Sequence, residues 1–99
     1  MKRVYISQPM RGLTDEEIQL VREDALLFAQ NYLGEDDIRE IPNFVPSNKT
    51  RKPLEALGSC IALMADADLV IFCPDWETAR GCRIEHAVAK EYDMHFKQL

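Results

Sequence analysis

The chain has 99 residues, of which 46% are hydrophobic and 29% are charged, and its formal net charge is −5. This length predicts one domain spanning residues 1–99, and the composition is that of an ordinary globular protein. The negative charge argues against a nucleic-acid-binding protein, which needs a basic face. No segment is as apolar as a membrane span or the core of a signal peptide, so we expect a cytoplasmic protein without membrane contacts.

The first predicted strand covers residues 3–7, RVYIS, which are rich in β-branched and aromatic side chains. It breaks at Gln8 and Pro9 into a loop that carries Arg11 and Gly12.

A helix is predicted next, because Thr14 and Glu17 have the spacing of a capping box and Gly34 is a typical stop. Between these ends, apolar residues recur at steps of three and four and predict one buried face: Ile18, Val21, Ala25, Phe28 and Tyr32.

A short second strand is expected near Ile38 to Ile41, followed by an irregular loop that reaches Lys52. Pro53 suits the first position of a second helix. The apolar face of that helix would comprise Leu54, Leu57, Ile61 and Met64.

Residues 68–74, DLVIFCP, form an unbroken apolar run and predict a central strand covered on both faces. A helix over residues 77–92 and a short strand within residues 94–99 complete the order β-α-β-α-β-α-β. This alternation predicts an α/β fold in which a parallel sheet of about four strands lies between helices. Ligands bind outside the carboxyl ends of such strands, where residues 7–12 and 73–81 would lie.

Glu85 is out of place in the last helix, because it lines up with the apolar residues Cys82, Val88, Ala89 and Tyr92. A carboxylate in the first turn or so of a helix, at the edge of a ligand crevice, can stay ionised and act as a nucleophile or base. The alternative is a structural role, in which Glu85 complements the helix end or pairs with an arginine, namely Arg11, Arg80 or Arg83.

The three cysteines, Cys60, Cys73 and Cys82, form no CxxC pair and are odd in number, so we expect reduced thiols rather than disulfides. Cys82 and His86 are four residues apart and could ligate a metal with another cysteine. Such spacing more often reflects packing. We therefore predict no metal and no other cofactor.

Three segments, VYISQPMRGL, PNFVP and ADADLVIFCPDWETARGCRIEHAVA, resemble the nucleoside 2-deoxyribosyltransferase-like superfamily. They are most similar to its small bacterial and phage members, which read YISGPM…GL, then NP, then a pattern like CDAIVLLPGWEKSRGARLEHALA. The resemblance implies a flavodoxin-like, Rossmann-like three-layer domain that assembles as a homodimer or higher homo-oligomer. It also implies chemistry on a nucleoside or nucleotide.

The resemblance implies a role for each matching residue. Glu85 occupies the position of the nucleophile that attacks the anomeric carbon, and Tyr5 that of the residue orienting it. Ser7, Arg11 and Gly12 match the loop that contacts the substrate, where an Arg helps to hold a 5′-phosphate.

Further contacts are expected in the loop after the central strand. Arg80 and Gly81 could hold a phosphate at the helix start, or be a solvated arginine and a turn glycine. Trp76 could stack on a base or pack at a protein interface, and Asp75 faces the expected crevice.

Three positions depart from the pattern of the active relatives. Cys60 stands where they carry the Asp that protonates the departing base, Gln8 replaces the Gly of YISGP, and Ala79 replaces a Ser or Asp. A thiol is a poor acid for this purpose, so Asp66, Asp68 or Asp75 would have to serve, or a neighbouring subunit. Two hypotheses result: an N-glycosidase or deoxyribosyltransferase that uses Glu85, or an inactive nucleotide-binding module. A structural protein with an empty crevice is the third.

Overall fold

A computed structural model describes residues 1–43 and 52–99. The elements follow in the order β1 (Lys2–Ser7), α1 (Asp15–Leu33), β2 (Ile38–Glu40), α2 (Pro53–Met64), β3 (Leu69–Phe72), η1 (Trp76–Thr78), α3 (Arg80–Glu91) and β4 (Phe96–Gln98). η1 is a single 3₁₀ turn. Most of the irregular loop expected before Lys52, and part of the PNFVP segment, lie outside the described residues.

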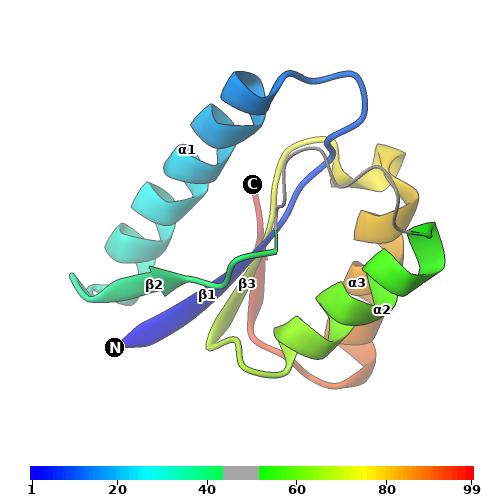
Figure 1. The fold of residues 1–99 in the computed structure, drawn as a ribbon. Helices are drawn as coiled ribbons and strands as arrows, with labels where there is room; N and C mark the ends of the chain where they lie inside the picture. Colours follow the sequence, from blue (N-terminus) through cyan, green and yellow to red (C-terminus); the bar gives the residue numbers. More distant parts are fainter. Residues whose placement is uncertain (44–51) are drawn as a thin grey trace.

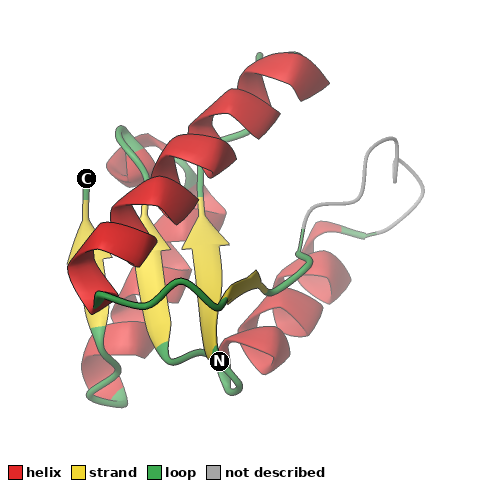
Figure 2. Ribbon diagram, turned by 90° about the vertical axis from the view of Figure 1, so that its left-hand side faces the viewer, coloured by secondary structure: helices red, strands yellow, loops and turns green. Residues whose placement is uncertain are grey.

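The four strands form one parallel sheet in the order β2-β1-β3-β4. Helix α1 covers one face, and α2 and α3 lie together on the other (Figure 1). In Figure 2 the central strands run side by side in the same direction, with α1 crossing over them. The predicted α/β fold with a flavodoxin-like three-layer arrangement is confirmed. Because the helices after β1 and β3 lie on opposite faces, a crevice is expected between the carboxyl ends of these two strands.

Alternation along the central strands divides the core into two layers. Val4, Ile6 and their neighbours on β3 pack under α1, whereas Tyr5 belongs to the layer under α2 and α3. Ser7 has the same parity as Tyr5, so both side chains point toward α3. This alternation therefore decides which residues of β1 can reach Glu85.

The predicted limits of α1 are confirmed. Thr14 and Glu17 form the capping box, and Gly34 ends the helix in the left-handed conformation with φ 64°. Tyr32 does not join the buried face as expected, because it is 43% exposed and stacks on Phe28 near the end of the helix. Arg22 is buried in that face instead.

The last two helices differ from expectation at their ends. α3 begins at Arg80, because residues 76–78 form the 3₁₀ turn and Ala79 is extended. Tyr92 follows the last turn of α3 and is 79% exposed rather than buried. Leu54, in the first turn of α2, is 80% exposed because it faces an open cleft instead of the sheet. Among the described residues, no helix has the length and apolar character needed to cross a membrane.

Candidate active site

Glu85 is the centre of a buried polar cluster formed by β1 and α3. Its side chain is only 6% exposed. The Ser7 hydroxyl donates a hydrogen bond to Oε1 at 2.7 Å, and the Tyr5 hydroxyl donates one to Oε2. Both donors come from one face of β1, and the helical stripe of α3 turns Glu85 toward them. The structure therefore brings together the two residues that the family resemblance paired, and adds Ser7 as a second donor.

The contacts of Glu85 differ from those of a carboxylate that complements a helix end or pairs with an arginine. Glu85 lies in the second turn of α3, whereas the charge of a helix end acts mainly within the first turn. Among the described residues, none of the ion pairs involves Glu85. Ser7, which was expected to contact substrate, is 1% exposed, and its hydroxyl is directed at Glu85.

Burial is the main influence on the charge of this cluster. It raises the pKa of Glu85 above 4.5, while the hydrogen bonds from Tyr5 and Ser7 act in the opposite direction. Burial and the adjacent Glu85 raise the pKa of Tyr5, so its hydroxyl stays protonated and remains a donor. Cys82, on the same helix, also faces Glu85, and burial raises the pKa of its thiol. The raised pKa values of Tyr5 and Cys82 keep both of these groups protonated, so Glu85 is the member of the cluster that carries the charge when it ionises.

This raised pKa predicts how stability depends on pH. An acid whose pKa is higher in the folded than in the unfolded state loses stability as pH rises from the unfolded pKa through the folded one. The free energy of unfolding of the native protein should therefore fall, relative to Glu85→Gln, as pH rises from about 4.5. Denaturant unfolding between pH 4 and 8 measures the difference. The same exchange at the exposed Glu77 is the control, and a constant difference between Glu85→Gln and the native protein would contradict the expectation.

A cleft of about 830 Å³ lies between α2, α3 and the loop after β1, and Glu85 is part of its lining. Arg80 and Gly81 line it too, as expected from the loop after the central strand. So do Cys60 and Ala79, two of the positions that depart from the family pattern. The other lining residues are mainly apolar: Gln8, Met10, Lys52, Pro53, Leu54, Ala56, Leu57, Cys82 and Ile84. Among these described residues, Glu85 is the only carboxylic acid.

Arg11 and Asp75 lie elsewhere, in a second hollow of about 410 Å³ that borders α1. The loop after β1 lies between the two spaces, since Gln8 and Met10 are in the lining of the Glu85 cleft while Pro9 and Arg11 are in the lining of the second hollow. Gly12 forms the following turn with φ 81°. The structure therefore does not bring Arg11, Gly12 or Asp75 to Glu85.

Trp76 is likewise not in the lining of the cleft. Its ring stacks on His86 with 4.0 Å between centroids, and it packs against Phe72. The His86 ring also contacts Gln98 through Nε2 at 2.6 Å. Within residues 1–43 and 52–99, no group of three or more His, Cys, Asp or Glu side chains could hold a metal ion. Trp76 and His86 thus pack against each other inside the domain.

The three aspartates considered as proton donors are not at the cleft. Asp66 and Asp68 precede β3, at the opposite end of the sheet, and Asp68 accepts a hydrogen bond from the Arg3 amide at 2.8 Å. Asp75 lies in the second hollow. The direction of β3 explains the places of Asp66 and Asp68, because residues that precede a strand lie at its amino end, and the cleft lies at the carboxyl ends of the strands.

Gln8, which stands in place of the Gly of YISGP, is in the lining of the cleft, but its side-chain amide is directed away from Glu85. Its side chain is 5% exposed and is turned toward α1, where Nε2 donates to the Ile18 carbonyl at 3.2 Å and Oε1 accepts from Arg22 at 2.8 Å. Sequence reasoning missed Arg22 and its partner Asn43. The signal was present, since Arg22 falls between Ile18 and Ala25 at helical spacing, as Glu85 does among apolar residues.

A family model described as Domain of unknown function (DUF4406) matches residues 2–98. Comparison with curated proteins finds no match.

Proposed function

The chain belongs to the DUF4406 family, a domain of unknown function, and from the geometry of its cleft we propose that it cleaves or exchanges the N-glycosidic bond of a nucleoside or nucleoside monophosphate. The observation that carries this proposal is the Glu85 carboxylate, which lies in the lining of a large cleft and is held at each oxygen by a hydroxyl donor. Such a carboxylate is oriented for attack on a carbon atom.

The proposed reaction has two displacements. One oxygen of Glu85 forms a bond to the anomeric carbon while the bond from that carbon to the base nitrogen breaks, and the bonding electrons leave with the base, which takes up a proton. Water, or the N–H nitrogen of a second base, then attacks the same carbon, the bond from that carbon to Glu85 breaks, the carboxylate is released, and the attacking group loses its proton to solvent. Hydrolysis and transfer differ only in this second nucleophile.

The dimensions and charges of the cleft suit a mononucleotide. About 830 Å³ falls within the usual range for small-molecule sites. Arg80 and Lys52 are exposed cations in its lining and are available to a phosphate, while the apolar walls would cover a sugar and a base. Because the described lining holds no second carboxylic acid, water in the open cleft would supply the proton to the base.

A non-catalytic nucleotide-binding module is the second candidate, and one observation favours it. Cys60 stands in the cleft at the position where the resemblance places the acid.

We also propose a homo-oligomer, which is supported by exposed apolar side chains such as Leu20, Leu27, Leu54 and Tyr92. A partner subunit could supply an acid to the cleft.

The test is to incubate the purified protein with a panel of 2′-deoxynucleosides and their 5′-monophosphates, with and without an acceptor base. Chromatography then measures released or exchanged base. We expect release, faster for a monophosphate than for the matching nucleoside because of the two cations. No release from any substrate, together with a rise in melting temperature on adding one nucleotide, would identify the binding module instead. If base is not released and the melting temperature does not rise with any nucleotide, both functions are refuted.

A further inference from the structure

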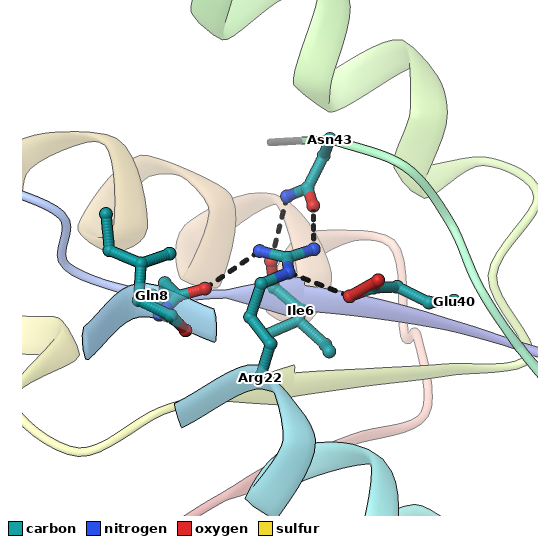
Figure 3. Close-up of polar contacts among 6 residues, drawn as sticks. Ile6, Gln8, Arg22, Glu40 and Asn43 are labelled. Atoms are coloured by element: carbon teal, nitrogen blue, oxygen red, sulfur yellow. Dashed lines mark hydrogen bonds and ion pairs between the residues drawn. The ribbon is translucent and has the colours of Figure 1, made fainter. Parts of the chain in front are cut away.

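Arg22 lies in the middle of α1 and is the most buried charged side chain among the described residues, at 2% exposed. A buried guanidinium is costly unless it is paired and hydrogen-bonded. Its Nε donates to Glu40 at 2.7 Å, Nη1 donates to Gln8 at 2.8 Å, and Nη2 donates to Asn43. Figure 3 shows the guanidinium between these three side chains. Arg22 thus connects α1 to the residue that follows β1 and to the end of β2.

Gln8 belongs both to this buried cluster and to the cleft of Glu85. It is 5% exposed and is part of the cleft lining, yet its amide group is hydrogen-bonded on the side of α1. Nε2 donates to the Ile18 carbonyl at 3.2 Å, and Oε1 accepts from Nη1 of Arg22 at 2.8 Å. A carbonyl only accepts and a guanidinium only donates, so these two partners allow one orientation of the amide. The Gln8 side chain is therefore held against α1.

The bond from Arg22 is the stronger of the two that hold this amide. A hydrogen bond from a charged donor is about twice as strong as a neutral one, and the distance to Arg22 is also the shorter. If Arg22 lost its donors, Oε1 of Gln8 would be a buried acceptor without this partner, and such an acceptor is costly. Glutamine is a flexible side chain, so it would turn to reach water. The open space that Gln8 borders is the cleft of Glu85.

We propose that Arg22 is a positioning residue for the cleft, which keeps the Gln8 side chain against α1 and out of the cleft. Because α1 covers the face of the sheet opposite to α2 and α3, Arg22 shapes the cleft from the far face, through the residue that follows β1 (Figure 1). These contacts do not depend on a substrate, but the effect on a nucleotide rests on the proposed function. The role requires Gln8 and Arg22 together, so a change at one should be corrected by a change at the other.

The first measurement is solvent exchange of the Gln8 side-chain NH₂ group, followed by NMR of ¹⁵N-labelled protein. Its signals are assigned by their loss in Gln8→Leu. In the native protein they should exchange at least about tenfold more slowly than those of Gln19, which is exposed. Arg22→Met removes all donors but keeps an unbranched side chain, and the Gln8 group should then exchange as fast as that of Gln19. Arg22→Met combined with Glu40→Met removes both members of the ion pair and replaces the single variant if it does not fold.

The second measurement follows access to the cleft without a substrate. Cys60 lines the cleft, and mass spectrometry of its peptide gives the rate at which iodoacetamide alkylates it. Arg22→Met should slow this reaction about threefold, because the released Gln8 side chain occupies part of the cleft. Gln8→Ala added to Arg22→Met shortens that side chain and should restore the native rate. A residue that only stabilised the fold would have the opposite effect, since a loosened domain exposes Cys60 and Gln8→Ala would not reverse the change.

Glu40→Gln is the matched control, since it weakens the ion pair of Arg22 and leaves the bond to Gln8 in place. It should lower the free energy of unfolding without changing the exchange of the Gln8 group or the alkylation of Cys60. If the protein turns over or binds a deoxynucleoside monophosphate, Arg22→Met should raise KM or Kd about tenfold, and the added Gln8→Ala should restore it.

Two results would overturn the proposal. One is a Gln8 NH₂ group that stays protected in Arg22→Met, and the other is an alkylation rate of Cys60 that does not fall in Arg22→Met or does not recover with Gln8→Ala. Both expected changes in a protein that neither cleaves nor binds nucleotides would support the role of Arg22 and refute the proposed function. Turnover with an unchanged KM in Arg22→Met would refute the role of Arg22 and leave the proposed function in place.

Discussion

Glu85→Gln is expected to lower the rate of base release by roughly 10³-fold or more, the scale of loss seen when a catalytic nucleophile is removed. A glutamine amide has nearly the same shape, so the cleft is preserved, but the amide cannot form the covalent bond to the anomeric carbon. The measurement is base release by chromatography under saturating substrate. Glu77→Gln on the exposed 3₁₀ turn is the matched control and should retain full activity.

Substrates with different leaving bases can test whether Glu85 acts as a nucleophile or as a proton donor. Burial raises the pKa of Glu85, which would also suit a general acid. 7-Methyl-2′-deoxyguanosine carries a base that departs without protonation. If Glu85 is the nucleophile, Glu85→Gln should lose activity on this substrate as well as on 2′-deoxyinosine. Activity retained on the methylated substrate alone would assign Glu85 the role of acid and contradict the mechanism proposed above.

Cys60→Asp is expected to increase the release of an unmodified base by about 10²- to 10⁴-fold, the usual contribution of a positioned general acid. Cys60 lines the cleft with Glu85 and lies close enough to Tyr5 to influence its ionisation. An aspartic acid there would share the cleft with the Glu85 carboxylate, and a like charge in the same cleft favours its protonated form and therefore its use as a donor. The measurement is kcat on 2′-deoxyinosine across pH 5 to 8.

Two comparisons make the Cys60→Asp result specific. The rate on 7-methyl-2′-deoxyguanosine should not rise, because that base needs no proton. Cys60→Asn, which has the same size but no ionisable proton, should show no gain on either substrate. An increase with Cys60→Asn equal to that with Cys60→Asp would mean that size or polarity, rather than acidity, limits the native protein.

Much of the site was visible in the sequence, because its central residue breaks a periodic pattern. Glu85 interrupts an apolar helical stripe, and the motif around it led to Tyr5 at the end of the first strand. Both were found in contact. The same argument applied to Arg22 would have detected the second buried charge, since it interrupts the apolar face of α1 in the same way.

Other residues were assigned to the wrong side or end of the sheet. Arg11 and Asp75 were placed with Glu85 because their loops follow neighbouring strands, yet both face the second hollow. The side on which a loop residue points depends on the backbone path of that loop, and periodicity does not extend into a segment without regular structure. Trp76 was misplaced for the same reason, since η1 turns it onto His86.

By itself, the sequence determined the alternation of strands and helices, the limits of α1 and the identity of the buried carboxylate. These features depend on side chains within about one or two helical turns of each other, so local spacing encodes them. Only the tertiary structure decided which groups reach Glu85, that the guanidinium of Arg22 donates to Asn43, and that the cleft holds Cys60 without a second carboxyl among its described residues. Those facts join residues that are separated by 21 to 80 positions, and packing of helices on both faces of the sheet brings them together.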